Sequence, residues 1–191
     1  MEKISPLHLL VIILCLIISS DALAADISGS IEYRDTVTDG KSGQKLEFYG
    51  SSIAAGKNVG ISGLASIGET YAEAYIGPIW TPASWISLEA GMGFQQIESG
   101  SPLRYAIAGW IGNGIGSLYY IREMGAANED WWEKFRALAN IGKLAKLGTV
   151  YEKGCGWGPI IEISLPSSRF KFRTAWYPEP NITQIGLLLC F

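Results

Sequence analysis

The stretch Ile182-Thr-Gln-Ile-Gly-Leu-Leu-Leu-Cys-Phe191 decides the fold, because its apolar residues recur at every second position up to a final aromatic residue. Successive side chains of a strand point to opposite faces, so Ile185, Leu187, Leu189 and Phe191 share one face. The last residues of a soluble domain usually fray. The pattern therefore predicts a terminal strand whose apolar face lies against an apolar environment.

This stretch resembles the closing strand of bacterial outer-membrane β-barrels, in which alternating hydrophobic residues and a terminal Phe are read by the outer-membrane assembly machinery. The resemblance implies that Ile185, Leu187, Leu189 and Phe191 form the assembly signal. Leu189 departs from the pattern, since an aromatic residue is commoner at that position. The motif covers only residues 182–191, so the rest of the chain needs independent support.

The beginning of the sequence has the three parts of a secretory signal. A weakly positive start at Met1–Lys3 precedes the apolar run Leu9–Ile18 and the small-residue pattern Ala22–Ala24. The run is far shorter than the roughly 20 apolar residues that a spanning helix needs. We expect a Sec signal peptide over 1–24, cleaved on export, and a mature chain that starts near Ala25.

Composition restricts how the remaining residues, 25–191, cross a membrane. The whole chain is 48% hydrophobic with a mean hydropathy of +0.19, yet no later run has the length of a spanning helix. In lipid every backbone polar group needs a partner within the structure, which leaves a closed barrel. The length suits one domain. The net charge of −3 gives no indication of a nucleic-acid partner.

Alternation of apolar and polar residues recurs in short segments along the chain, as in 27–37 and 84–96. The clearest segment, 169–177, places aromatic and charged side chains on opposite faces: Phe170, Phe172 and Trp176 against Arg169, Lys171 and Arg173. A transmembrane barrel strand has this pattern, with lipid outside and the lumen inside.

Turn signals divide the chain into strands. They fall at 39–43, 56–58, near Gly68, 81–84, 98–102, 112–114, 125–130, near 141–143, 153–157, 166–168 and 178–181. These breaks predict an all-β, single antiparallel transmembrane barrel of about twelve short strands. The breaks at Gly56, Gly68 and Ile141 are weak, so eight to ten strands are the alternative.

The orientation follows from counting strands back from a periplasmic end. It places Trp80, Trp85 and Trp110 near the periplasmic rim, and Trp131, Trp132, Trp157 and Trp176 near the outer rim. Two aromatic girdles are typical of the two membrane interfaces. Cys155 and Cys190 then lie at opposite rims, so we expect both to stay free.

The polar faces of the strands carry charges of both signs. We predict a lumenal charge cluster of Glu32, Arg34, Glu73, Glu89, Arg104, Glu162, Lys171 and Arg173, with Lys45, Glu47, Lys146 and Glu152 on the same faces. One interpretation is a selectivity ring along a pore. The other is a set of ion pairs that fills the lumen together with Tyr49, Tyr71, Tyr75 and Trp85. The mixed signs favour the ion pairs.

The single histidine, His8, limits catalysis because it lies in the predicted signal peptide. Known outer-membrane barrel enzymes that resemble this scaffold rely on a histidine, and imidazole-assisted nucleophiles and metal sites need one as well. We expect no enzymatic activity, no catalytic residue, no cofactor and no metal. A histidine-independent lipid-modifying enzyme, with Glu89 or Glu162 as general base, is the remaining enzymatic alternative.

These observations predict a non-enzymatic protein of a Gram-negative outer membrane, either a narrow porin-like conduit or a structural scaffold. The alternative is a surface-interaction or adhesion protein that uses its outer loops at 125–130 and 153–157. A soluble barrel around an apolar ligand needs the apolar face inside, which tryptophans at both rims oppose. The expected partners are outer-membrane lipid, lipopolysaccharide and the assembly machinery; the sequence leaves the oligomeric state open.

Overall fold

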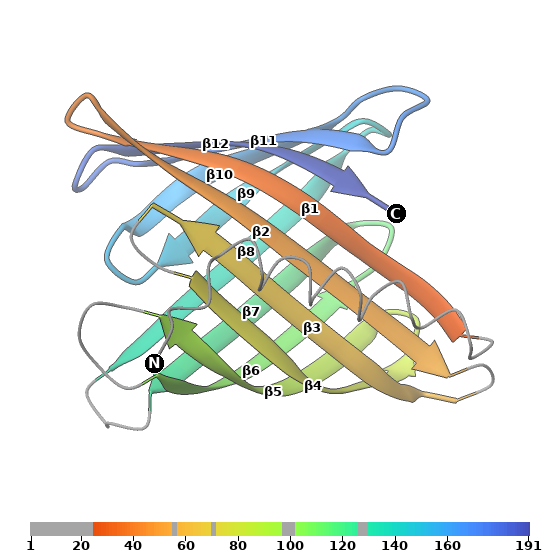
Figure 1. Ribbon diagram of the computed structural model, residues 1–191. Helices are drawn as coiled ribbons and strands as arrows, with labels where there is room; N and C mark the ends of the chain where they lie inside the picture. Colours follow the sequence, from red (N-terminus) through yellow and green to blue (C-terminus); the bar gives the residue numbers. More distant parts are fainter. Residues whose placement is uncertain (1–24, 55–56, 70–71, 97–101, 126–129) are drawn as a thin grey trace.

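The computed structural model describes residues 25–54, 57–69, 72–96, 102–125 and 130–191, and these form twelve β-strands (Figure 1). The strands are β1 (Ala25–Thr38), β2 (Lys41–Ala54), β3 (Val59–Gly68), β4 (Ala72–Ala83), β5 (Ile86–Gln96), β6 (Leu103–Gly112), β7 (Gly116–Gly125), β8 (Trp131–Ile141), β9 (Ala145–Glu152), β10 (Gly156–Ser164), β11 (Phe170–Tyr177) and β12 (Ile182–Cys190). Every predicted break lies at or beside a connection between strands. The twelve-stranded prediction is confirmed, and the smaller counts are wrong.

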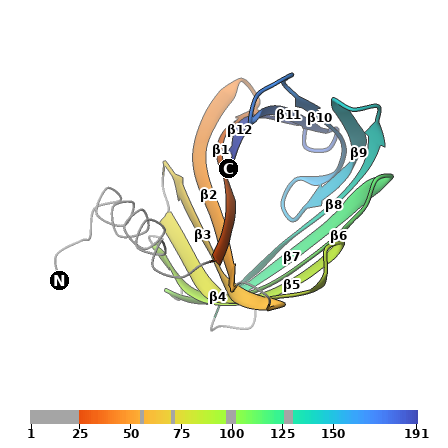
Figure 2. The same ribbon diagram turned by 90° about the vertical axis from the view of Figure 1, so that its right-hand side faces the viewer.

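Every strand pairs antiparallel with its neighbours in the sequence, and β1 also pairs with β12 to close the barrel (Figure 2). The closing ladder runs from Ser30 opposite Cys190 to Thr38 opposite Ile182. Closure leaves no strand edge without a hydrogen-bonded neighbour. The start of β1 and the C-terminus lie toward one end of the barrel, called here the terminal end; the other is the far end (Figure 1).

The alternation in the sequence separates the two faces of the wall. In β5, Leu88, Met92 and Phe94 are exposed on the outside, whereas Gly93 is buried on the inside. In β11, Trp176 is exposed and the adjacent Tyr177 is fully buried. Large apolar side chains on the outside and charges within are the arrangement of a transmembrane barrel.

The β1–β2 turn shows how local sequence makes a hairpin. Asp39 and Gly40 have φ angles of 51° and 74°. A two-residue type I′ turn needs positive φ at both central positions, and Asp-Gly is a favoured pair for it. Thr38 and Lys41 pair directly across the turn. The predicted turn therefore forms at the first two residues of 39–43.

The aromatic girdles are less regular than the sequence suggests. Trp80, Trp157 and Trp176 are exposed on the outer face, as expected. Trp110 lies opposite the lumenal Tyr119, and Trp132 lies opposite buried Glu123, so these two belong to lumenal positions. Their assignment to the girdles is wrong, because the alternation of the strands overrides their position at a rim.

The prediction that Trp85 fills the lumen is also wrong. Trp85 lies in the β4–β5 turn with 53% of its surface exposed, so it does not fill the interior. Tyr71, another predicted filler, lies outside the described residues, as does the predicted signal peptide over 1–24. Among the described residues, no helix has the length and hydrophobicity to cross a membrane.

Cys155 and Cys190 are free, as predicted. Cys155 lies in the β9–β10 turn and packs against buried apolar residues. Burial, and next the nearby Glu152 carboxylate, raise the pKa of this thiol to about 11. The thiol is therefore protonated at neutral pH, and Lys153 beside it does not make it reactive.

Candidate functional site: the lumenal charge network

Ion pairs connect charged side chains across six strands inside the barrel. The lumenal network consists of Glu32, Arg34, Lys45, Glu47, Glu73, Lys146, Glu162, Lys171 and Arg173. These residues come from β1, β2, β4, β9, β10 and β11. Alternation explains their inward direction, since each occupies a position whose neighbours along the strand face outward.

Arg173 is the centre of the network. Its guanidinium donates to Glu32 Oε2 at 2.8 Å and to Glu162 Oε2 at 2.7 Å. Both carboxylates are almost completely buried, at 5% and 4% exposure. Buried carboxylates need such partners, because an unpaired charge in this environment is strongly destabilising.

Gly186 allows this contact to cross β12, which lies between β1 and β11. It is the register partner of Arg34 on one side and of Arg173 on the other. A Cβ atom at this position meets Glu32 Oε1 at 2.8 Å. The missing side chain therefore provides the space in which the Glu32 carboxylate lies over β12.

Toward the far end the network continues over β1, β2 and β4. Arg34 Nε lies 3.2 Å from Glu32, and Arg34 Nη2 lies 3.8 Å from Glu47. Lys45 Nζ lies between Glu47, at 3.2 Å, and Glu73, at 3.8 Å. Toward the terminal end, Lys171 and Lys146 lie 3.6 and 4.0 Å from Glu162.

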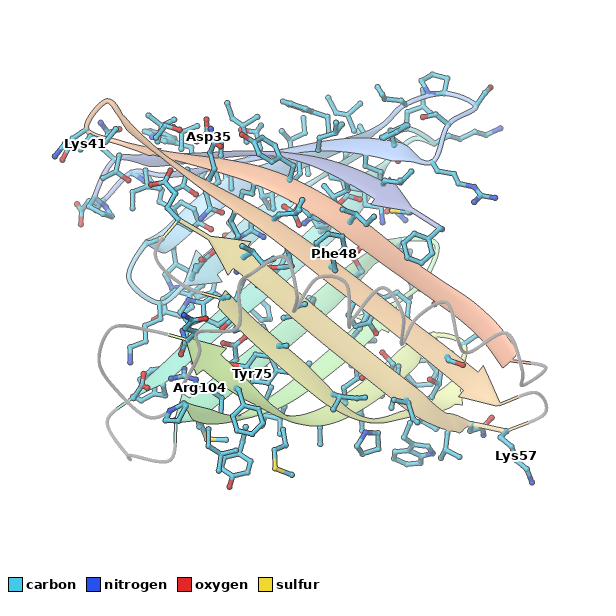
Figure 3. All side chains as sticks on the ribbon, viewed as in Figure 1. Asp35, Lys41, Phe48, Lys57, Tyr75 and Arg104 are labelled. Atoms are coloured by element: carbon cyan, nitrogen blue, oxygen red, sulfur yellow. The ribbon has the colours of Figure 1, made fainter. Side chains whose placement is uncertain are left out.

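Two members of the predicted cluster lie apart from this network. Glu89 accepts a hydrogen bond of 2.9 Å from the Tyr49 hydroxyl and forms no ion pair within the described part of the chain. Arg104 is paired with Asp130 at the far end; Figure 3 shows it on the same side of the barrel as Tyr75. The structure brings together the other six: Glu32, Arg34, Glu73, Glu162, Lys171 and Arg173.

Three charged residues face the lumen that the sequence analysis does not place there. Glu123 is buried and accepts from the Tyr75 hydroxyl at 3.2 Å, and Lys134 lies 2.8 Å from Glu152. Arg136 stacks on Tyr119, 5.3 Å from the ring centroid, and no carboxylate of the described residues lies within 4.0 Å of it. The two cations, Lys134 and Arg136, stand at every second position before the lumenal Leu138 in β8, so strand alternation could have placed them in the lumen.

The two sides of the lumen are filled differently. Strands β8–β12 and β1, called here the packed half, carry the centre of the network and a buried apolar cluster: Leu138, Val150, Ile160, Ala175, Tyr177 and Ile182. Strands β3–β6, called here the small-residue half, have small side chains at their centres: Ser62, Gly77, Gly91, Ala106 and Ala108. Long side chains therefore occupy one side and leave space on the other.

The free space narrows sharply along the axis. A vestibule of about 730 Å³ lies at the far end, lined by Lys45, Glu73 and Glu152 among others. Beside Arg136 and Arg173 the cavity measures only about 10 Å³, and beside Tyr49 and Glu89 about 40 Å³. A water molecule needs on the order of 10–15 Å³, so these inner spaces admit water and little else.

The acidic side chains of the described part of the lumen lie in ion pairs and hydrogen bonds. Within the described ranges, no group of three His, Cys, Asp or Glu side chains is suited to hold a metal ion. Each central carboxylate of the packed half is paired with a cation: Glu32 and Glu162 with Arg173, and Glu152 with Lys134.

The terminal strand places the predicted assembly residues on the outer face. Ile185, Leu187 and Phe191 are each at least 40% exposed there. The backbone of Phe191 exchanges two hydrogen bonds with Gly29 of β1, at 2.9 and 3.0 Å. A Cβ atom on Gly29 meets the Phe191 ring at 2.7 Å, so this glycine leaves room for the ring beside β1.

No known protein family and no curated protein matches the sequence. Two solved structures resemble the fold. The KdgM porin is 15% identical, with a TM-score of 0.56 over 85% of this chain and 99% of that chain. The KdgM porin in complex with disordered oligogalacturonate is 16% identical, with a TM-score of 0.55 over the same shares. The chain thus shares the barrel fold of these two porin structures.

Proposed function

We propose that this protein is a narrow, non-enzymatic conduit of the outer membrane whose lumen is closed at rest by its own ion pairs. The observation that carries the proposal is the Glu32–Arg173–Glu162 contact across the packed half, where the remaining cavity is about 10 Å³. In this proposal the terminal end faces the periplasm and the vestibule faces outside.

The charge pattern supports small conductance and weak ion selectivity. In the lumenal network, which extends from Glu73 at one end to Lys146 at the other, each glutamate lies beside an Arg or a Lys. Neither positive nor negative charge therefore dominates the inner wall. A ring of one sign attracts its counter-ion, whereas neighbouring opposite charges largely cancel along the path. Small closed barrels also tend to be filled by their own side chains.

The small-residue half supports a path for solutes. Gly77, Gly91 and Ala108 leave the wall thin, and the cavity of about 40 Å³ lies against them. The Tyr49–Glu89 hydrogen bond borders this cavity. Loss of the Tyr49 side chain is therefore the change that most directly widens the path.

A second candidate is the passage of acidic oligosaccharides. The KdgM porin was solved with an oligogalacturonate, and Arg136 of this chain offers a lumenal guanidinium with no carboxylate of the described residues within 4.0 Å. The paired state of the cations in the lumenal network favours the weakly selective conduit. A structural scaffold fits the same filled lumen, whereas a surface-interaction protein is the rival, and the short β9–β10 turn gives it little support.

Several expectations from the sequence belong to the same proposal. Export with a cleaved signal peptide over 1–24, assembly through Ile185, Leu187, Leu189 and Phe191, and contact with lipopolysaccharide agree with an outer-membrane barrel. Fractionation with the outer membrane, together with faster migration on gels before boiling, supports this location. Recovery as a soluble periplasmic protein without that heat shift overturns it.

The experiment for the conduit is solute efflux from liposomes that contain the refolded barrel. Wild type should release small ions slowly and sugars hardly at all. Tyr49→Ala should raise the efflux of both, whereas Tyr33→Ala on the outer face, a matched loss of a tyrosine, should leave efflux unchanged. Equal efflux from all three proteins contradicts a path beside Tyr49.

A further inference from the structure

Two cations share one aromatic ring at the rim of the far end. The Arg122 guanidinium carbon lies 4.8 Å from the Trp131 ring centroid, and Lys153 Nζ lies 3.3 Å from the same centroid. The two charged groups therefore lie no more than about 8 Å apart, held by cation–π attraction. These three residues are called here the rim cluster.

Strand alternation places Arg122 and Trp131 on the outer side of the wall at the far end, where Trp131 and Lys153 also border the vestibule. Arg122 follows the exposed Leu118 and Tyr120 on the outer face of β7, near the end of that strand. Trp131 begins β8, and Lys153 directly follows β9. Exposed Trp157 lies on the neighbouring β10, where its ring contacts Phe135 and Tyr151, so aromatic side chains gather on the outer face near this rim, as at a membrane interface.

The rim cluster has unused hydrogen-bond donors. Arg122 Nε is buried without a hydrogen-bond partner. Lys153 Nζ donates to the Trp131 carbonyl at 2.9 Å, which leaves two of its three donors. No carboxylate of the described residues lies within 4.0 Å of either cation, unlike the pairs of Arg34, Lys45 and Arg173 in the lumen.

One acidic residue, Glu133, lies near the rim cluster, and its carboxylate is hydrogen-bonded to a tyrosine. Glu133 is the register partner of Arg122 across β7 and β8. Its carboxylate accepts a hydrogen bond of 3.0 Å from the Tyr120 hydroxyl. Glu133 lowers the local positive charge without pairing with either cation, so the rim cluster keeps a net positive charge.

We propose that the rim cluster binds the phosphate group of a lipid in the outer leaflet of the membrane. A phosphate offers several acceptor oxygens and a charge of −1 to −2, which match a guanidinium and an ammonium held close together. The outer-face position of Arg122 and Trp131, together with exposed Tyr120 and Trp157 on the same face, selects a lipid as the source of the phosphate. The assignment rests on the membrane location proposed above and is independent of whether the lumen conducts.

The test is native mass spectrometry of the folded barrel in detergent with bis-phosphorylated lipid A. Removing both charges, by Arg122→Gln with Lys153→Gln, should weaken binding about tenfold or more. Lipid A without its phosphates should bind wild type as weakly as the intact lipid binds the double variant. Glu133→Gln, which removes the local negative charge, should tighten binding.

Lys41→Gln is the matched control, because Lys41 is an exposed cation at the same end of the barrel (Figure 3). It should bind lipid A like wild type. Arg122→Lys is a milder change that keeps the charge, and it should retain most of the affinity for lipid A. It supplies the comparison with wild type if the double variant folds poorly. Equal affinity of the double variant and wild type overturns the site. Full displacement of the lipid by equimolar inorganic phosphate overturns the choice of a lipid.

Discussion

The packed half and the small-residue half of the lumen differ in how far their side chains fill the interior of the barrel. In the packed half, Arg173 and its two glutamates lie beside an apolar cluster that includes Val150 and Tyr177, both without exposed surface. In the small-residue half, Gly77, Gly91 and Ala108 bring little volume into the lumen. The difference indicates that one side of a small barrel can close the passage while the other keeps space for it.

The largest effect is expected from removing the cation at the centre of the packed half. Arg173→Gln leaves Glu32 and Glu162 without their shortest ion pairs, at an expected cost of about 3–5 kcal/mol in the free energy of unfolding. Urea titration in lipid vesicles measures this cost. Lys171→Gln, at the margin of the same network, is the control and should cost far less. Equal costs contradict a central role for Arg173.

The outer face of the same strand gives the next effect. Phe172→Arg places a charge toward lipid, at an expected cost of about 2–4 kcal/mol near the midplane. Lys171→Gln alters the adjacent lumenal position and should fold almost normally. The comparison uses the same urea titration. A larger loss from Lys171→Gln than from Phe172→Arg means that the inner and outer faces are reversed.

Gly186→Ala should have a smaller effect within the packed half. The new Cβ comes within 2.8 Å of Glu32 Oε1, so the carboxylate must shift away from Arg173. Such crowding typically costs about 1–3 kcal/mol, and a flexible carboxylate places this change at the low end. Glu32→Gln combined with Gly186→Ala shows whether the two act together. Additive costs mean that the glycine serves another purpose.

Gly91→Ala should have the smallest effect, because the small-residue half has room for it. The added Cβ has ordinary contacts there, the shortest 3.5 Å to Tyr75 Cβ. We expect a change in the free energy of unfolding within about 0.5 kcal/mol. Gly91→Gln should fold as well and slow ion efflux from liposomes. A large loss of stability in Gly91→Ala contradicts free space on this side.

The fold was predictable because strand signals are local. Turn signals such as Asp39-Gly40, and alternation in segments such as 169–177, depend on neighbouring residues only. The inward direction of Glu32 and Arg173 followed from the same alternation. Their contact did not, because they lie 141 residues apart and meet only through the register of β1, β12 and β11.

The failures arise where local signals conflict. In Trp131-Trp-Glu-Lys134 apolar and charged residues come in pairs, which hides the inward position of Lys134 and of Arg136 beyond it. Trp110 was assigned to a girdle from its residue type, although its parity with the lumenal Arg104 placed it inside. Arg104 of β6 forms an ion pair with Asp130, which lies directly before β8 and outside any strand, so strand alternation could not predict this pair.

Conductance in a planar lipid bilayer tests the closed conduit most directly. Single wild-type barrels should show small conductance and weak cation-to-anion selectivity, because Arg173 and its glutamates fill the packed half. Arg173→Gln should raise the conductance and make the current noisier, in any molecules that remain folded. A large, steady wild-type conductance that Arg173→Gln leaves unchanged shows instead a lumen that its ion pairs do not close.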